Sequence, residues 1–211
     1  VLHLAEELEG VGLNFSVGRC LRNRQCIGRV FGCLRLVADL DVDLGKCVER
    51  AGLLDKIAVR SAFRQRTFEK RDRSYFGLDT GRFTFLFTFH MLSVMERKNP
   101  LGLIRAFRQA FQKDEKVSLV LKTSFGDRHP AQLEELRDAA AGAPITIIDQ
   151  VFSPDEVLSL MDACDAYVSL HRSEGLGLTL AEAMLMGKPV IATGFSGNMD
   201  FMTPENSLLV G

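Results

Sequence analysis

The chain has 211 residues, 46% of them hydrophobic, and a formal net charge of −1 at pH 7. This length suits one large or two small domains with an apolar core, and the near-neutral charge excludes a general electrostatic attraction to nucleic acid or anionic membranes. No run of about 18 apolar residues is present, so the sequence predicts no membrane-spanning helix. The first residue is Val rather than Met, which indicates a fragment, and VLHLAEELEG lacks the pattern of a signal peptide.

The cysteines and the first third of the chain offer little chemistry. The five cysteines lack metal-like pairing, which favours reduced thiols in a cytoplasmic protein. Residues 1–70 show weak periodicity and no motif, and we expect a truncated or atypical segment there. The basic stretch 56–73 includes Phe63 and Phe68, which leaves a nucleic-acid surface open, but a solvated helix face is the ordinary explanation. We therefore expect no nucleic-acid partner.

From about residue 82 the pattern becomes regular. Apolar, β-prone runs predict strands at 83–89, 117–123, 145–149, 166–170, 189–193 and 207–210. Helical patterns lie between them, beginning at Pro100 and covering 131–142, 153–164, 178–186 and 197–202. Strands that alternate with helices at short spacing predict an α/β fold with a doubly wound, Rossmann-like parallel sheet. In such folds, ligands bind outside the carboxyl ends of the strands.

Two helix starts carry specific signals. Asn99 is a candidate N-cap, and Pro100 suits the first helical position. Ser153 and Glu156 form a capping-box pattern that opens the helix at 153–164.

The segment LHRSEGLGLTLAEAMLMGKPVIATGFSGN, residues 170–198, is the most informative about function. Glu174 stands beside Gly175 and Gly177 just after a predicted strand, and Glu182 follows after seven intervening residues, inside a predicted helix. A strand, a glycine-containing turn and a helix bring backbone N–H groups and a helix N-terminus to an anion. A carboxylate on that helix can accept hydrogen bonds from sugar hydroxyls. The pattern predicts a site for a phosphate and a polyol together.

Other strand ends add candidates for the same site. Arg97 and Lys98 come just before a helix start, where they could hold a diphosphate, although surface charges flanking a helix are the alternative. Lys122 interrupts an apolar strand, and we expect it to point to the same cleft. The backbone of 148–151 could contact a base edge, and the small residues of 193–198 suit close backbone approach. We expect the histidines His90 and His171 to be packed or hydrogen-bonded rather than catalytic.

These motifs together resemble a family. SEGLGLTLAEAMLMGKPVIAT is similar to the Glu-x7-Glu signature of the retaining, GT-B-fold glycosyltransferases of family 4. The similarity continues through ERKNPLGLIRAF, VSLVLKTS and ITIIDQVFSPDEVLSLMDACDAYVSLHRSEG, and through GFSGNMDFM and TPENSLLV. It covers about residues 71–211, so we expect this range to be the C-terminal, nucleotide-sugar-binding domain of such an enzyme, with 1–70 as an unmatched segment.

The resemblance implies roles for individual residues. Glu182 would bind the ribose hydroxyls, Glu174 would lie beside the donor sugar, and Lys98 would bind the diphosphate, which makes Glu174 and Lys98 the expected catalytic pair. The other donor-binding residues would be Arg97, Lys122, Gly175, Leu176, Gly177 and Leu178. Relatives often have Asp where this chain has His90, so a role for His90 is in doubt.

The resemblance also implies the substrates. We expect a UDP- or GDP-linked sugar donor, a glycan or lipid-linked acceptor, and a place in glycan or cell-envelope polysaccharide synthesis. No cofactor and no metal are expected, since no Asp-x-Asp stands at a strand end in 76–211. Peripheral association with the inner face of the membrane would come through a missing N-terminal domain.

Two alternatives remain open. The chain could bind a donor without catalysing transfer, because a complete GT-B enzyme has a second Rossmann-like domain that holds the acceptor. It could also be a hydrolase that uses Glu174 and Glu182 as an acid/base pair, which requires carboxyl groups about 5–10 Å apart.

Overall fold

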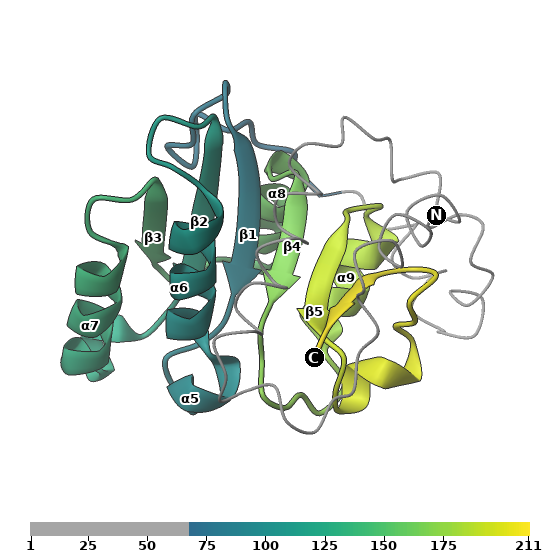
Figure 1. Cartoon of the computed structure of the whole chain (residues 1–211). Helices are drawn as coiled ribbons and strands as arrows, with labels where there is room; N and C mark the ends of the chain where they lie inside the picture. The colour runs from purple at the N-terminus through teal and green to yellow at the C-terminus, as the bar shows by residue number, and fades with distance from the viewer. Residues whose placement is uncertain (1–67) are drawn as a thin grey trace.

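The computed structural model describes residues 68–211, which form one parallel sheet with helices on both faces (Figure 1). The predictions for residues 1–67, and for every cysteine except Cys164, lie outside the described residues. Within 68–211, no helix is long and apolar enough to cross a bilayer.

The six predicted strands are all present, and all neighbouring pairs are parallel. Their order in the sheet is β3-β2-β1-β4-β5-β6. The strands are β1 (Phe83–Thr88), β2 (Val117–Thr123), β3 (Ile145–Asp149), β4 (Ala166–Ser169), β5 (Val190–Thr193) and β6 (Leu208–Val210). The doubly wound α/β fold predicted from the sequence is therefore confirmed.

The helices cover the sheet from both sides. Figure 1 shows α6 and α7 in front of the sheet and α8 and α9 behind it. The helices are α5 (Met95–Lys98), α6 (Pro100–Ala110), α7 (Pro130–Ala140), α8 (Pro154–Ala163) and α9 (Leu178–Leu185), with short 3-10 turns η3 (Gly126–Arg128) and η4 (Gly197–Asp200). Because both faces are covered, the central strands are apolar almost throughout, and β1 is buried at every residue after its first.

The front layer illustrates how the core is built. Phe85 of β1 packs against Phe107 of α6 and against Phe111, the C-cap residue after α6, with ring centres 6.4 and 6.0 Å apart. Leu119, the partner of Phe85 on β2, is fully buried beside it. Ile104 and Phe107 are both buried, so the apolar face of α6 is the one that lies on the sheet.

One helix start was predicted correctly and the other only in part. The Ser153 hydroxyl accepts from the Glu156 N–H at 3.2 Å, and the Glu156 carboxylate accepts from the Ser153 N–H at 2.8 Å, so the capping box opens α8. Pro100 does begin α6, but the side-chain cap predicted for Asn99 is wrong. Asn99 has a left-handed backbone (φ 54°), and its amide instead donates to the Leu170 carbonyl at 2.8 Å.

The strand order places the site. The chain runs outward from β1 through β2 to β3, crosses back to β4 beside β1, and then runs outward in the other direction. The order therefore reverses between β1 and β4, and the loops that follow these two strands diverge. In open α/β sheets this is the crevice in which ligands bind.

Candidate functional site

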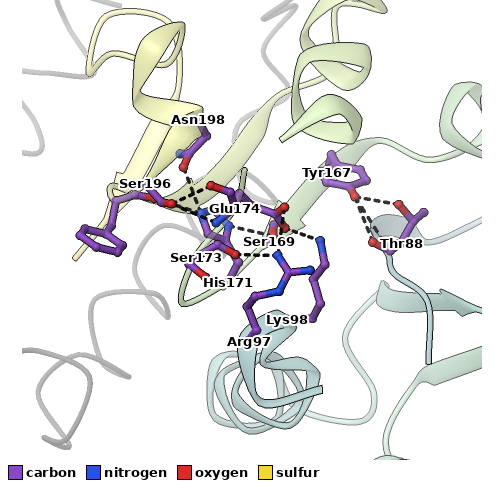
Figure 2. Close-up of polar contacts among 11 residues, drawn as sticks. Thr88, Arg97, Lys98, Tyr167, Ser169, His171, Ser173, Glu174, Ser196 and Asn198 are labelled. Atoms are coloured by element: carbon purple, nitrogen blue, oxygen red, sulfur yellow. Dashed lines mark hydrogen bonds and ion pairs between the residues drawn. The ribbon is translucent and has the colours of Figure 1, made fainter. Parts of the chain in front are cut away.

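An ion pair joins the two loops at the point where the strand order reverses. Lys98, at the end of α5 after β1, donates a short hydrogen bond from its ammonium to the Glu174 carboxylate, which follows β4 (Figure 2). The Lys98 and Glu174 side chains are only 15% and 12% exposed. Two residues predicted to bind different parts of a donor are thus in direct contact with each other.

Arg97 reinforces this contact. Its guanidinium donates to the Ser173 carbonyl at 3.0 Å and lies 3.5 Å from the Glu174 carboxylate. The Arg97 carbonyl also accepts from the Arg172 N–H at 2.8 Å. Arg97 and Lys98 stand just before α6, as predicted, and they also form the last turn of α5, an element that the sequence did not predict. Two cations face one carboxylate, so this contact set carries net positive charge.

The loop after β5 holds Glu174 from the other side. The Ser196 hydroxyl donates to the Glu174 carbonyl at 2.7 Å and accepts from the Glu174 N–H at 3.1 Å. The Gly197 N–H also donates to the Glu174 carbonyl, at 3.1 Å. A Cβ at Gly197 would lie 1.8 Å from the Gly175 carbonyl oxygen, so only glycine permits this approach. The close backbone approach predicted for 193–198 is confirmed.

A buried histidine ties the same loops together. His171 is fully buried, and its Nε2 lies 3.2 Å from the Phe195 carbonyl oxygen and 3.1 Å from Asn198 Oδ1. The Asn198 amide nitrogen donates to the Thr193 carbonyl, so Oδ1 acts as the acceptor and His171 Nε2 as a donor. The Ser169 hydroxyl lies 3.1 Å from Nδ1. The predicted hydrogen-bonded role of His171 is confirmed.

The turn into α9 presents unpaired backbone donors. Gly177 has a left-handed backbone (φ 81°) and precedes the first helical residue. Within the described part of the chain, the N–H groups of Gly175, Leu176, Gly177 and Leu178 donate to no other group. The side chains of Leu176 and Leu178 are exposed. The first turn of a helix with free N–H groups favours an anion.

Glu182 lies one turn into α9 and is half-buried. It follows Thr179 by three residues and therefore shares its face of the helix. Thr179 hydrogen-bonds to the buried Tyr167 hydroxyl, which also lies 2.8 Å from the Thr88 hydroxyl. Burial raises the pKa of Tyr167, so the phenol bridges β1 and β4 as a neutral group, and Figure 2 shows it to one side of the Lys98–Glu174 contact.

Lys122 is a residue of β2. It lies beside the end of β3 rather than at the Lys98–Glu174 contact. It is in register with Thr88 and 95% buried, since its exposed fraction is 5%. Its ammonium lies 5.1 Å from the centre of the Phe152 ring. Burial lowers the pKa of Lys122, while the carboxylates of Asp149 and Glu156 oppose the shift.

His90 follows β1 and is within electrostatic reach of both Lys98 and Lys122. Its Nδ1 is 2.8 Å from the Ser124 hydroxyl, and its ring stacks on Phe125. Partial burial, then the charges of Lys122 and Lys98, lower the pKa of His90. The imidazole is therefore neutral at pH 7 and becomes a third cation only in acid.

A pocket of about 490 Å³ adjoins the end of β3. Ile148, Asp149 and Gln150 line it together with Phe152 and Tyr75. Two strands, β2 and β1, separate β3 from β4, so the pocket lies about 14 Å across the sheet from the loop of Glu174 at about 4.8 Å per strand.

Sequence reasoning missed three residues of the site. Ser173 offers its carbonyl to Arg97, Asn198 orients His171, and Ser196 holds the Glu174 backbone. Only the small-residue character of 193–198 pointed to this loop. Among residues 68–211, no group of three or more His, Cys, Asp or Glu side chains is arranged to hold a metal ion.

Comparison with known proteins agrees with this geometry. Residues 82–211 match the family model of the group 1 glycosyl transferases. The chain is 29% identical over 162 residues to an alpha-monoglucosyldiacylglycerol synthase of Streptococcus pneumoniae, covering 75% of this chain and 35% of that protein. The chain thus spans about a third of the length of this curated relative.

One solved structure shows the same fold, and a second is similar over a comparable share of the chain. An OtsA apo structure matches 58% of this chain and 31% of its own, with 12% identity and a TM-score of 0.50. A structure of Anabaena Alr3699/HepE in complex with UDP and glucose matches 62% of this chain and 34% of its own, with 25% identity and a TM-score of 0.48. With a parallel sheet, a Lys98–Glu174 site at the reversal of strand order and the family match over most of the described residues, the chain belongs to the group 1 glycosyl transferases.

Proposed function

We propose that residues 71–211 bind a UDP- or GDP-linked sugar and form the donor half of a retaining glycosyltransferase of family 4. The observation that carries this proposal is the convergence of Lys98 and Arg97 on Glu174 beside the free N–H groups of 175–178. Cations and a helix N-terminus suit a diphosphate, and the carboxylate suits a sugar hydroxyl. The site therefore fits both chemical parts of a nucleotide sugar.

In this proposal, donor binding exchanges the partner of Lys98. The diphosphate takes the ammonium and the Arg97 guanidinium, and the Glu174 carboxylate is then available to accept a hydrogen bond from the sugar. During transfer the bond between the anomeric carbon and the diphosphate oxygen breaks, and negative charge develops on that oxygen. Lys98 is already positioned to stabilise this charge. Electrostatic stabilisation of this kind is usually the largest single contribution to catalysis.

Retention would follow from attack on the same face as the leaving group. The acceptor oxygen bonds to the anomeric carbon, and its proton passes to the departing diphosphate oxygen. No protein nucleophile is then required, and catalysis depends on positioning. The relative's name states an alpha-linked glucosyl product, which is the outcome of retention from an α-linked nucleotide donor.

The nucleoside would lie between α9 and the end of β3. Glu182 would accept from the ribose hydroxyls, and the backbone of 148–151 would meet the base at the 490 Å³ pocket. Lys122, whose ammonium is close to Phe152 at that pocket, would contact the nucleoside end of the donor. The distance of about 14 Å across the sheet suits an extended ligand.

The acceptor would be a glycan or a lipid-linked sugar. The name of the Streptococcus pneumoniae relative specifies a glucosyl lipid, which favours a lipid-linked acceptor and peripheral contact with the inner face of a membrane. Several exposed apolar side chains lie in the loops after β1, β4 and β5 and at the start of α9: Leu92, Val94, Leu176, Leu178 and Phe195. They suit a surface that an acceptor domain covers.

A second candidate function is donor binding without transfer by this chain alone. It is favoured by one observation: the chain spans 35% of its curated relative. In both cases the donor site is the same, and the acceptor site would come from residues outside the described range.

Calorimetry on the 211-residue chain tests the proposal. We expect binding of one nucleotide class among UDP-, GDP- and ADP-sugars, and weaker binding after Lys98→Ala. Lys113→Ala, which removes an exposed lysine of the loop before β2, is the matched control. Hydrolysis of a simple glycoside without a nucleotide would instead support the hydrolase alternative.

A further inference from the structure

Ser196 has a backbone conformation that serine rarely adopts. Its φ of 84° and ψ of −157° lie in a region that is populated almost only by glycine. A non-glycine residue persists there only when its surroundings over-determine the backbone. The next residue, Gly197, lies so close to the 174–175 turn that a Cβ there would overlap the Gly175 carbonyl.

The surroundings of Ser196 do fix it from both sides. His171 Nε2 holds the Phe195 carbonyl before it and Asn198 Oδ1 after it, at 3.2 and 3.1 Å. His171 itself is fully buried at the end of β4. The loop after β5 therefore cannot relax around Ser196 without breaking buried hydrogen bonds.

The serine hydroxyl gives the strained position a use. It donates to the carbonyl and accepts from the N–H of one residue, Glu174, at 2.7 and 3.1 Å (Figure 2). Glycine would fit the backbone without strain but would offer neither bond. The strained residue thus hydrogen-bonds to the backbone of Glu174, and the Glu174 side chain pairs with Lys98.

We propose that Ser196 is a positioning residue, which holds the Glu174 backbone so that its carboxylate stays at Lys98 and at the donor sugar. The claim that Ser196 positions Glu174 for the donor sugar rests on the proposed function. The claim that Ser196 positions Glu174 for its ion pair with Lys98 does not.

Two substitutions separate the hydroxyl from the strain. Ser196→Ala removes the hydroxyl and keeps the Cβ, while Ser196→Gly removes both. Because glycine relieves the strain, the Gly variant should melt at a higher temperature than the Ala variant. Because both variants lack the hydroxyl, the ratio of UDP-glucose affinity to UDP affinity should fall in both, by about two- to tenfold.

Ser159→Ala is the matched control. Ser159 lies on α8 and is more deeply buried than Ser196, and its hydroxyl contacts both the N–H and the carbonyl of one residue, Arg71, at 2.6 and 3.5 Å. Its loss should lower the melting temperature without changing the ratio of UDP-glucose to UDP affinity. A wild-type ratio in either Ser196 variant would overturn the proposal.

A measurement without any donor decides the remaining case. A double-mutant cycle of Lys98→Ala and Glu174→Ala gives the stability coupling of the ion pair. We expect a weaker coupling in the Ser196→Ala background than with Ser196 present. Equal coupling in the two backgrounds would overturn the positioning role. If the wild-type chain binds no nucleotide, the proposed function fails, and this cycle still decides the role of Ser196.

Discussion

The Lys98 ammonium and the Glu174 carboxylate, 76 residues apart in the chain, form an ion pair across the reversal of strand order. Each side chain is mostly buried, so solvent screens the pair less than it would screen an exposed pair. Its position follows from topology, because parallel strands β1 and β4 end at the same edge of the sheet. Five predictions depend on this contact and its neighbours.

Lys98→Ala should weaken binding of a nucleotide diphosphate by about 1.5–3 kcal/mol, which is the usual contribution of a hydrogen bond to a charged group. In dissociation constants this is roughly 10- to 150-fold. Titration calorimetry measures it, with Lys113→Ala as the control. Unchanged affinity for UDP and GDP would contradict a diphosphate role for Lys98.

The two glutamates should differ in what they bind. Glu174→Gln should weaken the sugar nucleotide but leave the free nucleotide bound at least as tightly, because Lys98 and Arg97 are released from their internal partner. Glu182→Gln should weaken both ligands alike, by about 1–3 kcal/mol, because it removes a charged acceptor for the ribose. Identical profiles for the two variants would show that the division of roles is wrong.

Nucleotide binding should not require a divalent metal. Lys98, Arg97 and the free N–H groups before α9 supply the positive charge that a metal would otherwise provide. Affinity measured with EDTA should equal affinity measured with Mg²⁺ or Mn²⁺. Binding that disappears with chelator and returns with metal would refute this expectation.

Acid should strengthen donor binding through His90. Its pKa is lowered from the ordinary value of 6.5, so the imidazole is neutral at pH 7 and gains a proton only as the pH falls below 6.5. The new charge should raise affinity for UDP-glucose by up to about fivefold, or ~1 kcal/mol for charges 4 Å apart in water.

The same depressed pKa has the opposite sign for stability. The neutral form is favoured in the fold, so its contribution is present above pH 6.5 and is lost as the pH falls through the folded pKa. His90→Gln should remove both pH dependences. An identical affinity profile in wild type and His90→Gln would show that His90 is remote from the donor.

The 211-residue chain should transfer sugar very slowly. Positioning of two reactants contributes on the order of 7–11 kcal/mol, and the described residues build only the donor side. Turnover that depends on acceptor and reaches ~1–10 s⁻¹, an ordinary enzyme rate, would show that this chain also builds an acceptor site. Product formation from labelled UDP-glucose and a glucosyl lipid measures it.

The order of strands and helices, and the residue types at the candidate site, could be predicted from sequence patterns alone. The alternation of apolar runs and helical patterns predicted all six strands, because parallel strands buried on both faces require apolar side chains throughout. The spacing of Glu174 and Glu182 and the glycines between them identified a turn into a helix. The Ser153–Glu156 capping box is a local interaction, so its sequence pattern was sufficient.

Which side chains contact one another at the site could be read only from the tertiary structure. Asn99 failed as a side-chain cap because its amide has a better partner 71 residues away, the Leu170 carbonyl. Lys122 lies over Phe152 because its register with Thr88 sets which face of the sheet it occupies. The positioning role proposed for Ser196 depends on its backbone conformation. That conformation is held because the Phe195 carbonyl and the Asn198 side chain both hydrogen-bond to His171. Such contacts join residues far apart in the chain, so no local pattern of residues records them.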